Sequence, residues 1–173
     1  CVVDNGSSDE TISIVSERYP KVQWVQNHKN LGYALGNNKG MEYALKAGAD
    51  IVMLVNNDTR LHESCVQTLV NGLESDHKRG IIGPMVYTWE KDQTISSAGG
   101  SVNWRYADAE NVGMGEKDRG QFHGRLVDFI NGCGIMASRE AIVKTSGLDS
   151  KYFMYWEETD WCLRVKKAGF KVF

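Results

Sequence analysis

Carboxylate and amide side chains follow two apolar runs of this sequence, at the point where each run ends. Asp4 closes the run 1–4, and Asn56, Asn57 and Asp58 come directly after the apolar run 51–55. Asn and Asp are common turn formers, so one interpretation is a strand that simply stops. The other is that an acid at the carboxyl end of a strand in an open α/β sheet lies where ligands bind.

Neither acid is followed by a glycine-rich loop of the kind that cradles phosphates. The sequences G-x-G-x-x-G and G-x-x-x-x-G-K-[ST] are absent after Asp4 and after Asp58. If the ligand carries a diphosphate, a metal must therefore neutralise its charge. A hard divalent cation held by one or two carboxylates and by phosphate oxygens fits this requirement.

A third acidic group stands near the C-terminus, after the aromatic run 152–156. Glu157, Glu158 and Asp160 open a segment with helical periodicity that runs to about Ala168. Acids in a first turn suit the helix dipole, and Asp160 can pair with Arg164 four residues on, so a structural role is one alternative. The other is a general base, because a carboxylate beside bulky aromatic side chains is partly desolvated and holds its proton more tightly.

The elements that would position these groups alternate in the first half of the chain and change character after residue 80. Apolar patterning predicts, in order, strands and helices over 1–4, 7–19, 22–25, 33–48, 51–55 and 62–76, which indicates a parallel sheet with right-handed crossovers. The second half predicts a strand over 80–87, a hairpin over 94–104 turning at Gly99 and Gly100, a long loop over 105–124, strands over 125–130 and 132–138, and helices over 139–147 and 155–169.

The composition describes an ordinary globular domain. The chain has 173 residues, 42% of them apolar, and a formal net charge of −2, with no cluster of Lys and Arg that would indicate a nucleic-acid partner. Its apolar runs are too short to cross a bilayer. The four cysteines are widely scattered, which is typical of free thiols in a reducing compartment and predicts a cytoplasmic protein.

Four motifs together resemble the family 2 nucleotide-sugar glycosyltransferases, especially their bacterial rhamnosyltransferase-like branch. They are, in the family's order, "VVDNGSSDET", "NLGYALGNNKG", "LVNNDTRL" and "SGLDSKYFMYWEETDWCLRVKKAGFKV". The resemblance implies the GT-A fold, a mostly parallel central sheet flanked by helices. The chain begins at what would be the family's second strand, so we expect the first strand to be lacking and the chain to be a piece of a longer protein.

The resemblance also implies how the chain is divided. We expect residues 1–173 to form a single GT-A catalytic domain fragment, with a nucleotide-sugar-binding half over 1–79 and an acceptor and base half over 80–173.

The resemblance assigns donor-binding roles in the first half. Asp4 would contact the nucleotide base, and a second group would shape the nucleotide pocket, namely Asn30, Gly32 and Asn38. The segment Asn56-Asn57-Asp58 occupies the family's D-x-D position, which makes Asp58 the ligand of Mg²⁺ or Mn²⁺. Asn56 departs from that motif because it replaces the first acid and offers only a neutral oxygen.

The catalytic base is expected in the segment Glu157-Glu158-Thr159-Asp160, where the family usually has Glu-Asp-x-Asp. Glu158 stands at the position of the usual catalytic aspartate and keeps its carboxylate, although the side chain is longer by one methylene. We therefore favour Glu158 as the base, with Asp160 as the alternative.

The implied reaction is metal-dependent transfer of a sugar, with rhamnose from deoxythymidine-diphosphate rhamnose as the favoured donor, to an acceptor hydroxyl with inversion. The expected acceptor is a polysaccharide or a lipid-linked glycan, and membrane contact would involve only parts not present in this sequence, at the inner face of the membrane. Two alternatives remain open: a nucleotidyltransferase that makes the activated sugar, and a non-catalytic sugar-binding domain of the same fold.

Overall fold

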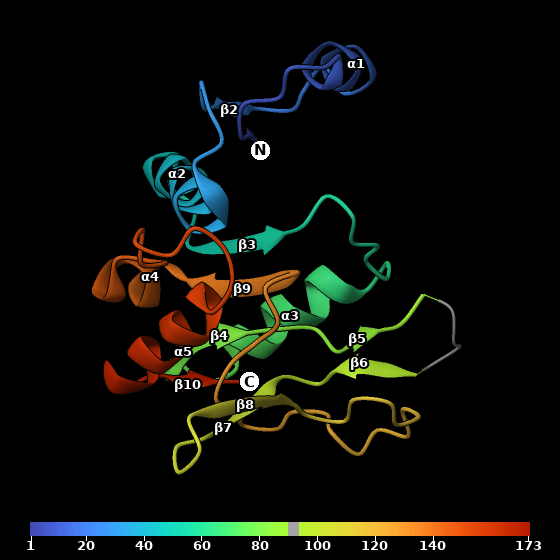
Figure 1. The fold of residues 1–173 in the computed structure, drawn as a ribbon, viewed down its shortest axis with the longest axis vertical. Helices are drawn as coiled ribbons and strands as arrows, with labels where there is room; N and C mark the ends of the chain where they lie inside the picture. Colours follow the sequence, from blue (N-terminus) through green and yellow to red (C-terminus); the bar gives the residue numbers. More distant parts are fainter. Residues whose placement is uncertain (90–93) are drawn as a thin grey trace.

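The computed structural model describes residues 1–89 and 94–173 (Figure 1). The elements follow one another along the chain as β1 (Val2–Asp4), α1 (Thr11–Arg18), β2 (Trp24–Gln26), α2 (Gly32–Lys46), β3 (Ile51–Val55), α3 (Cys65–Glu74), β4 (Arg79–Ile82), β5 (Val86–Tyr87), β6 (Ile95–Ser97), β7 (Gly100–Asn103), β8 (Asp108–Asn111), β9 (Gly134–Ser138), α4 (Arg139–Thr145), α5 (Glu157–Lys167) and β10 (Lys171–Val172).

The first two strands form a small sheet of their own. β1 and β2 pair in parallel, with Val3 opposite Val25, and α2 lies between this pair and the rest of the protein (Figure 1). The alternating pattern of the first half predicted that β3 would join them. Among the described residues it does not: β3 pairs with β9 instead.

The larger sheet has four strands in the order β10-β4-β9-β3. β10 runs parallel to β4, but β9 runs antiparallel to both β4 and β3. Strands β10, β4 and β3 therefore run in the same direction, and β9 is the one strand of this sheet that runs against them. The sheet is mixed and flanked by helices, and it keeps the expected mostly parallel direction with β9 as the exception. Strand β9 follows the segment 83–133 along the chain and enters between β4 and β3.

Helices cover both faces of the four-stranded sheet. Alternate residues of a strand point to opposite faces, and in β9 this places Met136 against Leu69 and Leu73 of α3. On the other face, Ile135 and Ala137 belong to the main core. That core also contains Ala34 and Met41 of α2, Ala141 and Ile142 of α4, and Trp161, Cys162 and Val165 of α5.

The segment 83–130 differs most from the sequence-based expectations. The predicted strand 80–87 is split into β4 and β5 around Gly83 and Pro84, where proline cannot donate a ladder hydrogen bond. The predicted hairpin over 94–104 is wrong, because β6 pairs with β5 whereas β7 pairs with β8. β8 lies inside the predicted loop 105–124, and the predicted strand over 125–130 has only a single bridge, between Phe129 and Gly100.

None of the described helices is long and apolar enough to cross a membrane. The four cysteines are free: Cys162 is buried, Cys65 and Cys133 are partly buried, and Cys1 is exposed.

Candidate active site

The loop after β3 is both a turn and a candidate ligand site. The Thr59 N–H donates to the Asn56 carbonyl oxygen over 3.1 Å, which closes a turn, and the Asn56 N–H donates to the Cys133 carbonyl oxygen over 3.1 Å. Asp58 is exposed at the tip of this turn. No described residue donates a hydrogen bond to its carboxylate, so both oxygens are available to a ligand.

The residues present suit a metal that also binds a substrate. Asp58 and the side-chain oxygen of Asn56 are hard oxygen donors, and Mg²⁺ in substrate sites is typically held by one or two carboxylates plus phosphate oxygens and water. Within residues 1–89 and 94–173 no group of three or more acidic, His or Cys side chains could hold a metal alone. The arrangement therefore fits a cation that arrives with a diphosphate, and does not fit a closed protein cage.

The segment Asn131, Gly132 and Cys133 lies between the two acidic regions. The Tyr33 hydroxyl of α2 donates to the Gly132 carbonyl oxygen, and Asn131 accepts a hydrogen bond from the Cys133 N–H over 3.0 Å. Burial, and then the negative charge of Asp58, raise the pKa of the Cys133 thiol, which shows that Asp58 lies nearby. Sequence reasoning missed Tyr33 and this segment, although the polar interruption "NGCG" before β9 was a signal.

Two residues with left-handed backbone introduce α5. Tyr155 and Trp156 have φ of 73° and 72°, a conformation that is costly for bulky side chains and is found mostly where function requires it. It turns the chain sharply into the helix, so that Glu157 and Glu158 occupy the first turn.

The two glutamates have different surroundings. Glu157 is only 4% exposed, and its Oε2 has no hydrogen-bond partner among the described residues. Burial raises the pKa of Glu157, and the charge of Glu158 adds to this.

Glu158 is partly exposed and lies close to Gly132. The closeness can be judged from where a side chain on this glycine would begin: its Cβ would lie 3.4 Å from the Tyr33 hydroxyl and 3.9 Å from Glu158 Cγ. Burial, followed by the charges of Glu157 and Glu158, raises the pKa of the Tyr33 hydroxyl, so it stays a hydrogen-bond donor.

Asp160 lies on another side of α5 and is part of a structural brace. Its Oδ2 accepts from Arg164 Nε over 2.7 Å, and the same guanidinium donates to the carbonyl oxygens of Thr145 and Gly147 over 2.6 and 2.8 Å. This pair connects α5 to the end of α4.

The predicted donor-binding residues Asp4, Asn30 and Gly32 lie together around Asn5. Asn5 Nδ2 donates to Asn30 Oδ1 over 2.9 Å and to the Gly32 carbonyl oxygen over 3.1 Å. Asp4 is 6% exposed and accepts from the N–H groups of Gly6 and Ser7, each over 3.2 Å. Asn5, the hub of this group, was not predicted; its position inside the "VVDNGSS" motif was the available signal.

Asn38 is placed differently from the other predicted pocket residues. Its amide donates to the Leu148 carbonyl oxygen over 2.7 Å and accepts from the Leu148 N–H over 3.0 Å. The side chain is thus engaged in joining α2 to the segment after α4.

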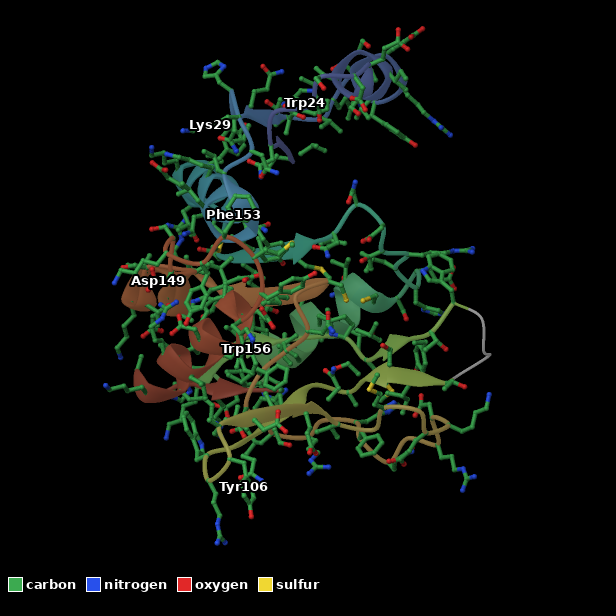
Figure 2. The ribbon with its side chains drawn as sticks, viewed as in Figure 1. Trp24, Lys29, Tyr106, Asp149, Phe153 and Trp156 are labelled. Carbon is green, nitrogen blue, oxygen red and sulfur yellow. The ribbon has the colours of Figure 1, made fainter. Side chains whose placement is uncertain are left out.

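Gly32 connects the residues around Asn5 to the aromatic segment 152–156 that precedes α5. It has a φ of 78°, and a Cβ there would overlap the carbonyl oxygen of Phe153. The N–H of Tyr33 donates to that same oxygen over 2.7 Å. Figure 2 shows Phe153 against α2 and Trp156 closer to the middle of the molecule.

The aromatic segment itself presents an exposed surface next to the glutamates. Four consecutive side chains are more than half exposed, namely Phe153, Met154, Tyr155 and Trp156. Exposed aromatic faces of this kind are common at binding sites.

The sequence of this chain is similar to those of known glycosyltransferases. The family model described as glycosyl transferase family 2 matches residues 1–145. The N-acetylglucosaminyl-diphospho-decaprenol L-rhamnosyltransferase of Mycobacterium tuberculosis is 25% identical over 97% of this chain and 61% of its own length. The dTDP-rhamnosyl transferase RfbF of Shigella flexneri is 25% identical over 99% of this chain and 55% of its own. The chain thus spans little more than half the length of these relatives.

Solved structures show the same fold. The mannosyltransferase PcManGT from Pyrobaculum calidifontis, in complex with GDP-Man and Mn²⁺, superimposes with a TM-score of 0.62 at 16% identity, over 99% of this chain and 43% of that one. GalNAc-T7 with UDP, GalNAc and Mn²⁺ gives a TM-score of 0.72 at 15% identity, over 98% of this chain and 34% of that one. Both are GT-A glycosyltransferases, which confirms the expected fold class.

Proposed function

Because this chain belongs to glycosyl transferase family 2, we propose that it transfers a sugar from a nucleoside-diphosphate sugar to an acceptor hydroxyl with inversion. Residues 1–79 bind the donor, and residues 80–173 contribute the base and the acceptor surface. The names of two relatives, a decaprenol-linked L-rhamnosyltransferase and a dTDP-rhamnosyl transferase, favour deoxythymidine-diphosphate rhamnose as donor and a lipid-linked glycan or polysaccharide as acceptor.

The observation that carries this proposal is the segment 131–133, which touches both acidic regions. Cys133 binds the Asn56 loop through its carbonyl oxygen, and Gly132 lies beside Glu158 and Tyr33. Asp58 and Glu158, from different halves of the chain, therefore belong to segments that both contact residues 132–133, which supports a shared role. A single displacement needs one group at the leaving diphosphate and one at the acceptor, and this pair supplies both.

Asp58 and the side-chain oxygen of Asn56 would hold a divalent cation, which would bind the diphosphate of the donor. The chemistry that Mg²⁺ or Mn²⁺ supplies in such a site is neutralisation of negative charge on the departing diphosphate. Both structural relatives were solved with Mn²⁺, which supports this choice of cofactor. Asp4, Asn30 and Gly32, organised by Asn5, form the wall for the nucleotide.

Glu158 acts as the general base. It accepts the proton of the acceptor hydroxyl as that oxygen attacks the anomeric carbon from the side opposite the diphosphate. Its partial exposure leaves room for the acceptor, whereas Glu157 is enclosed. Asp160 is committed to Arg164, which supports Glu158 over Asp160 for this role. The exposed aromatic side chains of Tyr155 and Trp156 offer faces on which the acceptor sugar stacks.

The test is to incubate the full-length protein with a panel of nucleotide sugars, an acceptor, and either Mg²⁺ or Mn²⁺, and to measure free nucleoside diphosphate. We expect release that depends on the acceptor and the metal, and a product whose anomeric configuration, read by NMR, is opposite to that of the donor. Formation of a nucleotide sugar from a sugar phosphate would indicate a nucleotidyltransferase instead. Donor binding without any release would indicate a non-catalytic sugar-binding domain.

A further inference from the structure

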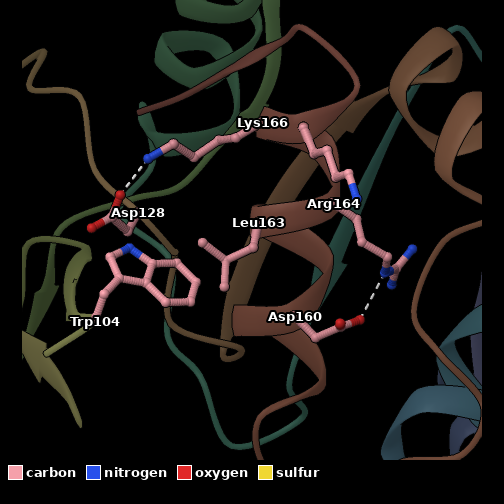
Figure 3. Close-up of a pocket in the computed structure, with 7 residues that line it drawn as sticks. Trp104, Asp128, Asp160, Leu163, Arg164 and Lys166 are labelled. Atoms are coloured by element: carbon pink, nitrogen blue, oxygen red, sulfur yellow. Dashed lines mark hydrogen bonds and ion pairs between the residues drawn. The ribbon is translucent and has the colours of Figure 1, made fainter. Parts of the chain in front are cut away.

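A cavity of about 410 Å³ lies on the far side of α5, between that helix and the turn of the β7–β8 hairpin (Figure 3). Trp104 of the hairpin forms one wall and Leu163 of α5 the opposite wall. The indole of Trp104 is 72% exposed, although burial of so large an apolar side chain is normally favourable. Trp104 and Leu163 together give the cavity an apolar lining among its polar groups, which is the usual composition of a small-molecule site.

This cavity is distinct from the candidate active site. Successive residues of an α-helix are rotated by about 100°, so Leu163 lies about 140° and Lys167 about 180° around the helix from Glu158. Asp160 and Lys167 therefore line a face that looks away from Glu158 and Tyr33. A molecule in this cavity does not occupy the space where the proposed transfer takes place.

The wall that carries Trp104 is held firmly against α5. The Val102 N–H donates to Asp128 Oδ2 over 2.9 Å, and the Asp128 N–H donates to the Gly100 carbonyl oxygen over 2.8 Å. The other Asp128 oxygen forms an ion pair with Lys166 of α5 (Figure 3). Partial burial opposes ionisation of Asp128, but the hydrogen bonds from Lys166 and Val102 still hold its pKa below the usual value. The wall that carries Trp104 is therefore already in place before a ligand binds, which reduces the conformational entropy that the protein loses on binding.

The polar groups of the cavity that are not already paired are suited to hydrogen-bond with hydroxyl groups of a ligand. The Arg164 guanidinium and the Lys166 ammonium are already paired with carboxylates. Among the described residues, nothing pairs with Asp160 Oδ1 or with the Lys167 ammonium. One offers an acceptor and the other a donor, and a sugar hydroxyl can satisfy both.

The charges in the cavity give an anionic ligand little advantage, because Arg164 and Lys166 are already neutralised by their carboxylate partners. An acidic group would gain only Lys167 as an unpaired cation, and it would approach the carboxylates of Asp128 and Asp160. A neutral ring meets no such repulsion. The flat face of a pyranose carries C–H groups with partial positive charge, which the electron-rich face of an indole attracts.

We propose that this cavity is a secondary glycan-binding site. In it Trp104 stacks on a neutral pyranose unit, while Asp160 and Lys167 hydrogen-bond to its hydroxyl groups. Such a site would tether a glycan to the protein away from the reacting hydroxyl.

The site is tested by equilibrium binding of the full-length protein to chitotriose, mannotriose, a rhamnose trisaccharide and trigalacturonic acid, without donor or metal. We expect at least one neutral trisaccharide to bind with a dissociation constant below about 10 mM, and Trp104→Ala to weaken it about fivefold or more. Lys167→Met should weaken the same ligand. The matched control is Tyr106→Ala on the same turn, because Tyr106 is equally exposed, at 71%, and does not line the cavity.

Binding that is unchanged in both Trp104→Ala and Lys167→Met would overturn the proposal, as would tighter binding of trigalacturonic acid than of every neutral sugar. No binding of any trisaccharide up to about 10 mM would do the same. Since no transfer is measured, these results are independent of whether the proposed catalytic function holds.

Discussion

Glu157 and Glu158 are neighbours in the chain with opposite roles in the structure. Glu157 points into the protein, where one carboxylate oxygen has no partner among the described residues. A buried carboxyl group without a counter-charge prefers its neutral form. Glu158 is partly exposed and lies beside Gly132. At the scale of single residues, burial is what separates a structural acid from a candidate base.

The first prediction is that Glu157 makes folding less favourable as pH rises. The folded protein holds the Glu157 proton above its ordinary pKa of 4.5, so the unfolded chain loses that proton first. Stability therefore falls as pH rises from about 4.5 through the folded-state pKa. Glu157→Gln cannot ionise, so its free energy of unfolding, relative to the natural protein, should increase between pH 4 and pH 7.

Urea unfolding of both proteins at the two pH values measures this difference. Glu140→Gln is the control, since Glu140 is an exposed acid in the first turn of α4. A Glu157→Gln effect that is the same at pH 4 and pH 7 would show that this carboxyl group is not destabilised by burial.

At the scale of elements, α2 joins the parts of the candidate site. Its first residues contact the Phe153 and Gly132 carbonyl oxygens, and its middle binds Leu148 through Asn38. Helix α2 therefore positions both the residues around Asn5 and the segment that leads into α5.

The second prediction concerns Asn38. Replacing it with alanine leaves the N–H and C=O of buried Leu148 without partners, and each unsatisfied group costs about 1–3 kcal/mol. We expect Asn38→Ala to lower the free energy of unfolding by about 2 kcal/mol or more. Asn37→Ala is the control, because the Asn37 side chain donates, among the described residues, to the Tyr33 carbonyl oxygen within the same helix and joins no other element. Equal decreases in the free energy of unfolding of the two variants, measured by urea unfolding, would argue that the two Asn38–Leu148 hydrogen bonds do not stabilise the fold.

The third prediction distinguishes strand from loop within 105–124. The β7–β8 pairing protects backbone amides of 108–111, whereas 117–124 has, within the part of the chain that the structure describes, turns and an isolated bridge between Lys117 and Thr94. Hydrogen exchange should therefore be slower in 108–111 than in 117–124, and slowest in β3. Protection of 117–124 as strong as that of β3 would contradict this prediction and show that the segment is as rigid as the central sheet.

Some elements could be predicted from the sequence because their pattern is local. The apolar spacing of α2, α3 and α5 identifies these helices, and the polar residues after β3 point to a ligand. β8 could not be predicted, because "DAEN" carries no large apolar residue and forms a strand only through β7.

The contacts around the candidate site could not be predicted from local sequence patterns either. Tyr33 meets Gly132 across 99 residues of sequence, and Asn5 meets Asn30 across 25. The direction of β9 depends on how the second half of the chain folds onto the first. These features arise from tertiary packing, which leaves no periodic signal.

At the scale of the whole molecule, the described residues form four separate sheets, and two of these, β1-β2 and β10-β4-β9-β3, end on a strand with a free edge. β1 pairs only with β2, and β3 pairs only with β9 among those residues. The Val2 N–H and the Asp4 carbonyl oxygen bond toward β2, so the backbone of Val3, between them, faces the free edge. A free strand edge is a template for pairing with another chain.

The fourth prediction follows from that edge. A protein made of residues 1–173 should self-associate as its concentration rises, and Val3→Pro, which removes the donor at the edge, should reduce this association. Sedimentation velocity over a range of concentrations measures both. A mass that stays monomeric throughout would show that the edge is covered in solution.

In the proposed reaction Asp58 acts at the departing diphosphate and Glu158 at the acceptor hydroxyl, so the two residues, from different halves of the chain, have separable effects. The most direct measurement is steady-state kinetics and donor affinity of the full-length enzyme carrying Asp58→Asn or Glu158→Gln. Asp58→Asn should weaken both metal-dependent donor affinity and turnover. Glu158→Gln should leave donor affinity nearly intact and lower turnover by about 10² to 10⁴, the usual contribution of a general base. Near-normal turnover in Glu158→Gln, with turnover abolished in Asp160→Asn, would contradict the account and assign the base to Asp160.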